Sequence, residues 1–499
     1  MMKSRYLAAL AAAWAVSVLQ AQGPVGMFEG HGDVGVVLHP GSAAFDAATN
    51  TYTLTGSGDN MWAAEDDFQF VWKKVDAGWT GLTADVSIVT PIGEPHRKAA
   101  LMIRRTLDKN SEYVDAVIHG SGMTALQSRD EKGSTTREII SAATGPTRLS
   151  LVKSGDYVYT MVAGPGEELH LSGGSFKFAT NEPFYVGLGA CAHNKDATVQ
   201  VTFSNVRLGM GFVGGGNRNG NTYSTVETIP VSSTDQRQAV YVGPSRLESP
   251  MWAKDGKSLL LTNEGQLARL PITPKFDATP VRVDTGSLHE IGHHTAISPD
   301  GAMLGFTDET GGKTAIYTVP IAGGTPKVIT DHAVSWFQAW SPDGKTVLYC
   351  GTRNGKAQIL TMPSGGGAET ALGTANNNND SPEYSPDGKF IYFNSDRTGL
   401  MQIWRMTADG KDETQITADD FSNWFPHVSP DGTQVAYMSY DKGVTGHPND
   451  ADIHVRSMVL STKAVKVIAN FTGGPGSFHS AAWSPDSKSL ALVSYLLVR

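Results

Sequence analysis

Side chains able to bind a metal or move a proton recur at one position in the second half of the chain. A Ser-Pro-Asp-Gly turn, or a degenerate form of it, occurs six times, and four copies carry an acidic residue or histidine five positions earlier. These residues are Glu248, His293, Asp380 and His479. Imidazole and carboxylate groups suit a divalent cation if the fold brings them to one level of a narrow channel. The spacing therefore predicts a cation site.

Further groups for acid–base chemistry lie close to these positions: His294, Gln338, Glu383 and His427. In an enzyme, Glu383 would be the general base, with His293 and His427 as its catalytic partners. His293, His427 and His479 are the predicted metal ligands, and the candidate cations are Ca²⁺, Mn²⁺ and Zn²⁺. The alternative is that these groups form hydrogen bonds only with water and with one another.

Aromatic residues occur in the same segments. Trp336 and Trp424 are candidate ligand-binding residues because their faces could stack on sugar rings, and packing between structural repeats is the alternative. A second set of large residues stands directly before the turns, where we expect packing between repeats. That set is Trp252, Ile297, Trp340, Tyr384, Val428 and Trp483.

The turns recur with the period of a repeat architecture. Their aspartates stand at 255, 300, 343, 387, 431 and 486, so successive steps are 45, 43, 44, 44 and 55 residues. Proline presets φ, aspartate can bond its own backbone and glycine accepts positive φ, which together favour a tight turn. Short strands at this repeat length are typical of β-propeller blades, and six copies predict six blades. The longest step contains an insertion at 441–452, which we expect to form a loop at the rim.

The ends of the repeat region predict how the ring closes. After the last turn only one strand-like segment follows, 489–495. Two others, 225–231 and 238–242, precede the first repeat and have no blade of their own. We predict that they pair with the last strand and complete the sixth blade, so that the propeller spans 223–499.

The first part of the chain has a different pattern. Residues 22–209 contain about ten alternating strand-like runs and no helical pattern, which predicts a β-sandwich, with a Gly/Asn-rich linker at 210–222. Through residues 65–74 and 96–104 it resembles the concanavalin-like jelly-roll domains that accompany many secreted carbohydrate-active proteins. Its predicted glycan-binding face consists of polar residues on consecutive strands, Arg104, His119, Gln127 and Arg129.

The N-terminus predicts export. Lys3 and Arg5 precede an apolar run, and residues 1–21 therefore match a signal peptide cleaved near Ala21. Retention of this segment as a membrane anchor is the alternative. No later stretch is apolar and long enough to cross a bilayer. We expect the chain in the periplasm or outside the cell.

Charge and cysteine content narrow the range of partners. The formal net charge is −9 and no basic run occurs, which argues against nucleic acid and anionic membrane surfaces. The two cysteines, Cys191 and Cys350, stand in apolar strand-like runs, and we expect buried free thiols.

Residues 223–499 resemble the TolB-like family of six-bladed propellers of bacterial envelopes. The resemblance rests on residues 382–395, 401–406, 423–432 and 439–448. Together with the sandwich it implies an all-β fold: an N-terminal concanavalin-like jelly roll followed by a six-bladed propeller.

The oligogalacturonate lyases are similar propellers with seven blades. In them inner-strand histidine and glutamine hold a divalent cation that stabilises the enolate-like charge formed when a proton next to a uronate carboxylate is removed. The residues of matching type here are His293, His294, Gln338, His427 and His479.

Two functions remain open on the sequence. The first is an exported, non-catalytic protein that binds a carbohydrate or an envelope protein through the propeller channel and rim and the sandwich face. The second is a metal-dependent carbohydrate-active enzyme, a polysaccharide lyase or glycoside hydrolase, with its site in the channel. Fold alone does not decide between them.

Overall fold

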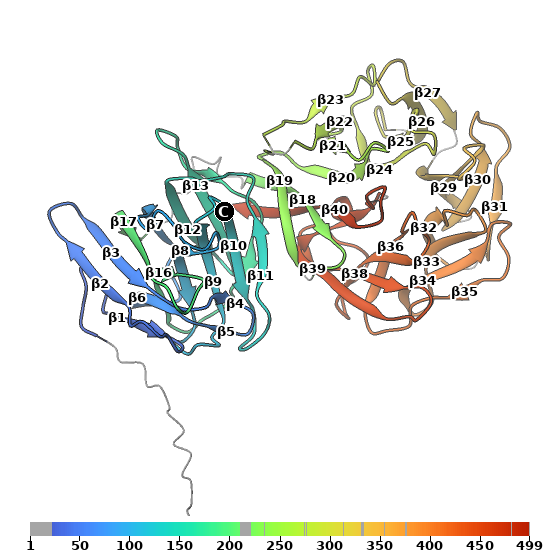
Figure 1. Cartoon of the computed structure of the whole chain (residues 1–499). Helices are drawn as coiled ribbons and strands as arrows, with labels where there is room; N and C mark the ends of the chain where they lie inside the picture. Colours follow the sequence, from blue (N-terminus) through green and yellow to red (C-terminus); the bar gives the residue numbers. More distant parts are fainter. Residues whose placement is uncertain are drawn as a thin grey trace, which may run out of the picture.

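The computed structural model describes residues 22–209 and 221–498, except 234, 274, 276, 313, 331–333, 354, 375–376 and 481. Two all-β parts lie side by side, the N-terminal sheets and a propeller (Figure 1). The predicted signal peptide and nearly all of the predicted linker lie outside the described residues. Within the described residues, no helix is long and apolar enough to be a membrane span.

Two antiparallel sheets form the N-terminal part and enclose one core. The first contains, in spatial order, β1 (Gly30–Val34), β6 (Phe68–Val75), β16 (Phe184–Cys191), β8 (Lys98–Arg104), β9 (Tyr113–His119), β10 (Thr124–Arg129) and β11 (Arg137–Ile140). The second contains β14 (His170–Leu171), β13 (Tyr157–Ala163), β12 (Arg148–Ser154), β7 (Gly81–Ile88), β17 (Val199–Leu208), β3 (Thr51–Gly56) and β2 (Ser42–Asp46), with β15 (Phe176–Lys177) also paired to β13. A hairpin of β4 (Met61–Trp62) and β5 (Glu65–Asp66) stands apart. Alternating side chains from both sheets, such as Leu101, Val114 and Leu151, fill the core between them.

Five four-stranded antiparallel sheets are blades of the propeller. The first is β20 (Leu247–Trp252), β21 (Ser258–Asn263), β22 (Gln266–Pro271) and β23 (Val281–Arg282), and the second is β24 (Ile291–Ile297), β25 (Met303–Asp308), β26 (Ala315–Pro320) and β27 (Lys327–Thr330). The third is β28 (Ser335–Trp340), β29 (Thr346–Arg353), β30 (Lys356–Pro363) and β31 (Thr370–Leu372), and the fourth is β32 (Asn379–Tyr384), β33 (Phe390–Thr398), β34 (Leu400–Thr407) and β35 (Thr414–Gln415). The fifth is β36 (Ser422–Val428), β37 (Gln434–Tyr440), β38 (Ala451–Val459) and β39 (Val465–Gly473).

The repeated turn works as its residue types predict. In the intact copies and the last one, the serine hydroxyl donates to the aspartate two residues later, as Ser385 Oγ does to Asp387 Oδ1 at 2.7 Å. Gly388 has a φ of 71°, which glycine accepts without strain. The large residue before each turn packs between blades, as predicted; Trp340, for example, lies against the cluster that joins Ile316 to Val347.

The predicted closing strands pair as expected but do not make a separate sheet. β18 (Asn221–Pro230) lies between β40 (Ser489–Val498) and β19 (Gln236–Gly243), antiparallel to both. β19 in turn pairs parallel with β11 through residues 236–238 and 138–140, so one ten-stranded sheet runs from the N-terminal part into the propeller (Figure 1).

By analogy with the other repeats, the stretch before the last turn, 478–483, is expected to be a strand, but of its described residues only Trp483 makes a β-bridge. Pro475–Phe478 forms a short helix, α1, and Trp483 makes an isolated bridge to Leu490 of β40. The sequence explains the helix, because Pro475 stands at its first position and has no N–H to lose.

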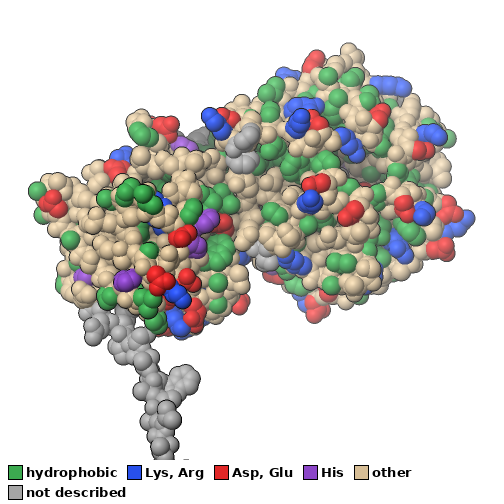
Figure 2. Space-filling model, in the orientation of Figure 1, with side chains coloured by type: hydrophobic (Ala, Val, Ile, Leu, Met, Phe, Trp, Pro, Cys, Tyr) green, Lys and Arg blue, Asp and Glu red, His purple; other side chains and the backbone are tan. Residues whose placement is uncertain are grey.

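The distribution of surface charge and the state of the two cysteines are as the sequence predicts. Figure 2 shows acidic and basic side chains interspersed over the visible face of the propeller, with no large field of one sign. Both cysteines are buried and free.

Candidate functional site

A cavity of about 380 Å³ opens beside the inner strands of the second to fifth blades. Four of the six residues that stand five positions before a turn line it: His293, Trp336, Asp380 and His479. His294 and His447 also line it. The sequence period therefore brings imidazole and carboxylate groups from different blades to one place.

Three of these histidines form a compact cluster. One ring nitrogen each of His293, His294 and His479 can be chosen so that all three lie within 4.8 Å of one another. The ring centroids are separated by 4.4 Å for His293–His294, 4.7 Å for His293–His479 and 4.4 Å for His294–His479. Among the described residues this is the one group of three or more such side chains that meets that spacing.

A β-bulge presents two of the histidines. β24 pairs with β25 at Ile291 and again at Thr295, and residues 292–294 oppose a single residue of the partner strand. The freed carbonyl of His293 accepts hydrogen bonds from Ser249 Oγ at 2.9 Å and Ser480 Oγ at 3.2 Å. The bulge is thus satisfied by side chains of the neighbouring blades, and it re-aims two consecutive side chains toward the cavity.

The third histidine is placed by α1. His479 is the C-cap of that helix, so the helix delivers its ring to the channel where a strand would have continued. The helix must pass close to the first blade, because a Cβ at Gly476 would lie 2.6 Å from Glu248 Oε1. Glycine at this position therefore permits the approach.

Burial keeps the three rings neutral near pH 7. Desolvation and the neighbouring imidazole of His447 lower the pKa of His293 to about 4. Burial and nearby histidines hold the pKa values of His294 and His479 well below their ordinary value. His479 Nε2 is buried and has no hydrogen-bond partner. Neutral imidazoles with a free nitrogen are the form that coordinates a metal.

Gln338 orients the ring of His294. Its amide nitrogen lies 3.1 Å from His294 Nδ1. With the amide in this orientation its N–H donates to Nδ1 and the ring proton is on Nε2. A 180° rotation of the amide, which lets its oxygen accept from Nδ1–H, is the orientation that leaves Nε2 free for a metal. This is the usual arrangement around a metal-bound histidine.

The insertion in the fifth blade brings a fourth histidine to the cavity. His447 packs against Trp424 and Phe425, with ring centroids 4.6 and 5.5 Å away. Its loop is held at several points: Tyr440 Oη donates to Pro448 O at 2.9 Å, and Arg246 Nη1 to Asp450 Oδ1 at 3.1 Å.

The N-terminal sheets also hold this loop. Asp452 follows it at the start of β38 and accepts hydrogen bonds from Tyr157 Oη and Lys177 Nζ, both at 2.7 Å. The rim of the channel is therefore tied to a part of the chain almost 300 residues away, since Tyr157 and Asp452 are 295 residues apart.

Two of the predicted catalytic residues, Glu383 and His427, are hydrogen-bonded to each other. His427 Nδ1 lies 2.7 Å from Glu383 Oε2, and His427 Nε2 lies 3.1 Å from Phe478 O. Glu383 Oε1 also accepts from the backbone N–H of Val428 at 3.1 Å. With both ring nitrogens engaged, His427 has none free for a metal, and the pair links two blades instead.

Glu248 also lies away from the histidine cluster. Its carboxylate is 3.2 Å from Arg246 Nε, beside α1, and it does not line the cavity. Asp380 does line the cavity, where its carboxylate and burial raise the pKa of the Cys350 thiol well above the ordinary value. Cys350 is therefore a protonated, unreactive lining group.

Of the two candidate tryptophans, one is placed to stack on a ligand and the other packs in the core. Trp336 is partly exposed at the cavity wall, with its ring 6.2 Å from that of His294. Trp424 is buried in the core of the fifth blade and donates from Nε1 to Ser422 Oγ at 3.0 Å. Only Trp336 remains available for stacking on a ligand.

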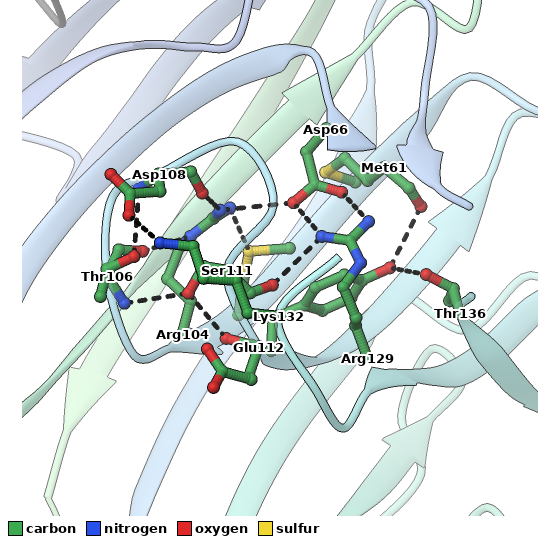
Figure 3. Close-up of polar contacts among 12 residues, drawn as sticks. Met61, Asp66, Arg104, Thr106, Asp108, Ser111, Glu112, Arg129, Lys132 and Thr136 are labelled. Atoms are coloured by element: carbon green, nitrogen blue, oxygen red, sulfur yellow. Dashed lines mark hydrogen bonds and ion pairs between the residues drawn. The ribbon is translucent and has the colours of Figure 1, made fainter. Parts of the chain in front are cut away.

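The predicted glycan face of the N-terminal sheets is not an open surface. Arg104 and Arg129 are 0% exposed and share one carboxylate, that of Asp66 on the β4–β5 hairpin (Figure 3). Arg129 binds it through two nitrogens, at 2.6 and 2.9 Å. His119 and Gln127 are buried too, so we remove Arg104 and Arg129 from the candidate site.

Sequence patterns missed several lining residues. His447 had a signal, since it is the histidine of the one large insertion. Phe425 and Cys350 had none: Phe425 enters the cavity because it sits at a bulge with a φ of 55°, and Cys350 is on a second strand rather than an inner one.

The channel cluster fits a divalent transition metal. It offers three neutral imidazoles, one of them with an unpartnered nitrogen, beside a cavity with room for a ligand. Imidazole suits Zn²⁺ and related ions, whereas Ca²⁺ requires a set of oxygen ligands.

Comparisons with known proteins place the propeller. The model of the TolB beta propeller domain matches residues 217–382 and 296–458. The uncharacterized protein Atu1656 of Agrobacterium fabrum is 42% identical over 280 residues, which are 56% of this chain and 94% of that protein. The solved structure of the putative TolB from Agrobacterium tumefaciens is 41% identical, with a TM-score of 0.53, and covers 56% of this chain and 99% of its own.

An oligogalacturonate lyase from Vibrio parahaemolyticus is similar at 16% identity and a TM-score of 0.35, over 54% of this chain and 77% of its own. Likeness of that size carries no argument about activity. The family match, the near-complete coverage of the Agrobacterium proteins and the five blades lead to one conclusion. The chain belongs to the TolB-like β-propeller family.

Proposed function

We propose that this is an exported binding protein whose propeller channel holds a divalent transition metal on His293, His294 and His479. The supporting observation is the clustering of three neutral histidines, within 4.8 Å of one another, at the wall of a cavity of about 380 Å³. A bound cation would place positive charge in a cavity that the carboxylates of Glu290, Glu309 and Asp380 also line. The ligand would then be an anionic glycan or an acidic side chain of an envelope protein.

The other lining groups support a sugar-sized ligand. Trp336 offers a partly exposed aromatic face next to His294, and Asp380 and His447 offer hydrogen bonds across the cavity. A mostly apolar wall with a few convergent polar groups is the usual composition of a small-molecule site.

The test is metal analysis of tag-free mature protein, followed by a thermal scan with and without a chelator. We expect close to one equivalent of metal in the channel and a lower midpoint after chelation, because a ligand that binds only the folded state stabilises it. Binding to acidic and neutral glycans is then compared before and after chelation. An unchanged metal content in the His293→Ala/His294→Ala double variant would contradict the site.

A metal-dependent lyase is the second candidate, and the structure alters its residues. Glu383 and His427 are bonded to each other outside the cavity, whereas His447 and Asp380 line it. We therefore propose His447 or Asp380, not Glu383, as the proton acceptor of any such reaction. Turnover of uronate oligosaccharides that survives both His447→Gln and Asp380→Asn would rule out these two residues as the proton acceptor, and no turnover by the unaltered protein would remove the lyase candidate.

We also propose that the architecture is the one expected from the sequence. β40, β18 and β19, with the Trp483 bridge on the inner side, occupy the place of a sixth blade, and the two N-terminal sheets correspond to a concanavalin-like sandwich. An experimental structure of the full chain tests both assignments.

A further inference from the structure

A second group of histidines lies at one end of the first N-terminal sheet. β16, β8 and β9 are neighbours in that sheet, and Cys191, Lys98 and His119 are aligned across it. His193 follows β16 by two residues and His96 precedes β8 by two. Three adjacent strands therefore carry one histidine each to the same end of the sheet.

Two of these histidines are within hydrogen-bonding distance of each other, a separation that a shared cation would also give. His96 Nδ1 and His119 Nδ1 are 3.3 Å apart. Two imidazole nitrogens bound to one tetrahedral Zn²⁺ at about 2.0–2.1 Å lie about 3.3–3.4 Å from each other. The ring of His193 is 5.5 Å from that of His96 between centroids.

Unpartnered nitrogens mark the group as incomplete. His119 is 3% exposed and its Nε2 has no hydrogen-bond partner, and the same holds for the buried Nδ1 of His193. Buried polar atoms without partners are rare and call for a ligand or another explanation. The orphan of His119 is the nitrogen that does not face His96, so the unpartnered nitrogen available to a cation beside the His96–His119 pair is that of His193.

The rings are in the protonation state that a metal requires. Burial, with smaller contributions from Lys98 and neighbouring histidines, lowers the pKa of His119 to about 2, and burial also lowers that of His193. Asp59 and Glu94 lie close enough to oppose the shift at His193, so negative charge is available beside the trio.

The loop that carries His96 is held rigidly. Arg97 is 8% exposed and donates to the carbonyls of Glu94 at 2.9 Å, Gly93 at 3.2 Å and Thr90 at 3.3 Å. The backbone of this loop also bonds to the turn after β9, since Gly120 N donates to Arg97 O at 2.8 Å. His96 and His119 are thus fixed relative to each other before any metal arrives.

One charge opposes a cation at this place. Lys98 lies near His119, but its Nζ donates to Asn60 Oδ1, Met61 O and Gln127 Oε1, and burial lowers its pKa. Asp115 is buried next to it, with both carboxylate oxygens free of hydrogen bonds. Burial raises the pKa of Asp115 well above its ordinary value, so it is the three oxygen acceptors that hold the lysine.

We propose that His96, His119 and His193 form a second divalent transition-metal site, for Zn²⁺ or an ion of similar preference, at the end of the N-terminal sheet. Unlike the channel histidines, these three do not bring one nitrogen each within 4.8 Å of one another, so binding requires a ring to turn toward the other two. It is separate from the channel site and does not depend on it. Its all-imidazole core excludes Ca²⁺ as the preferred ion.

The experiment is a Co²⁺ and Zn²⁺ titration of the full mature chain in which the channel site has been removed by His293→Ala/His294→Ala. We expect one remaining equivalent, with the visible absorption of tetrahedral cobalt. Adding His96→Ala or His193→Asn should weaken that binding by more than about 100-fold, beyond the roughly 10–100-fold of an outer-shell change. Asparagine suits residue 193 because its φ is 53°, a conformation that Asn tolerates.

The matched control is His170→Ala, an exposed histidine of β14 outside the trio, which should leave the titration unchanged. Because His96 is exposed, its replacement by alanine leaves the fold intact. Binding that persists in His96→Ala/His193→Asn, or no binding in the channel-deleted chain, would overturn the proposal. Neither result bears on the channel, which is scored in the reverse background with the trio mutated and the channel intact.

Discussion

Two buried polar regions of this molecule, one around Asp66 and one around His294, differ in how many of their polar atoms have hydrogen-bond partners. Around Asp66, two arginines and their neighbours use their hydrogen-bonding groups on one another, on backbone carbonyls and on the shared carboxylate. Around His294, the rings are neutral, one nitrogen is unpartnered, and a cavity lies alongside. Residue type alone does not separate the two, because both contain charged or titratable side chains on neighbouring strands.

The difference shows which buried polar groups point to function. A closed network stabilises the packing of a hairpin against a sheet and has nothing left with which to bind a ligand. An open cluster costs stability unless something completes it. We therefore assign the Asp66 network to structure and the channel histidines to binding.

The largest expected effect is on the closed network. Asp66→Ala leaves Arg104 and Arg129 buried without their common partner, and we expect a loss of about 3–5 kcal/mol in the free energy of unfolding. Urea denaturation measures it. Asp108→Ala is the control, because its ion pair with Lys132 is exposed and contributes little to stability. A loss at Asp66 no larger than the control would break the distinction.

Acid should act on the open cluster. The pKa values of His293, His294 and His479 are lower in the folded protein than in the unfolded chain, so below about pH 6.5 the unfolded chain binds more protons. Stability of the metal-free protein should therefore fall as the pH is lowered from about 6.5 toward 4. We expect a shallower fall in His294→Gln, measured by urea denaturation at a series of pH values. Parallel curves for the two proteins would contradict this account.

A smaller effect is expected from the residue behind the cluster. Gln338→Leu removes the group that orients His294, and we expect metal affinity to drop by about 10–100-fold. Gln338→Glu keeps an oxygen acceptor for Nδ1–H and should retain most of the affinity. Competition with a chelating dye gives both values. Equal affinities for the two variants would show that Gln338 does not position the ring.

The smallest effect concerns the tie between the N-terminal sheets and the channel loop. In Lys177→Met/Tyr157→Phe both contacts to Asp452 are lost, and stability should change by less than about 1 kcal/mol because the ion pair is half exposed. Amide exchange in residues 447–452 should nevertheless become faster, whereas Lys132→Met should leave it unchanged. Unaltered exchange would mean that the propeller alone holds His447 in place.

Much of the fold was predictable because it is repetitive. The Ser-Pro-Asp-Gly turns give the blades and their period, and the orphan strands near residues 225 and 240 give the partners of β40. In the N-terminal part the ten expected strands are present, but seven short or irregular ones, such as β1 and β11, lacked an alternating pattern. The short helix α1 was not predicted, because tertiary contacts with Glu248 and the channel, and not local helix propensity, place it there.

The sequence predicted which types of residue form the candidate site, but not which individual residues line the cavity. Equal offsets from the turn identified His293, Asp380 and His479, which line one cavity. The same offset also selected Glu248, which instead pairs with Arg246. Which side chain faces the axis depends on bulges at Ser249, His293–His294, Ser381 and Phe425, and a one-residue bulge leaves no mark in a single sequence.

The parallel pairing of β11 with β19 has a consequence for any shortened form of the protein. Only three residues of each strand pair, yet each strand would otherwise be the exposed edge of its own sheet, with unpaired N–H and C=O groups available to another chain. A propeller made without residues 22–209 would expose the β19 edge and should dimerise or aggregate through it. The two halves of the chain thus act as each other's protection against unwanted strand addition.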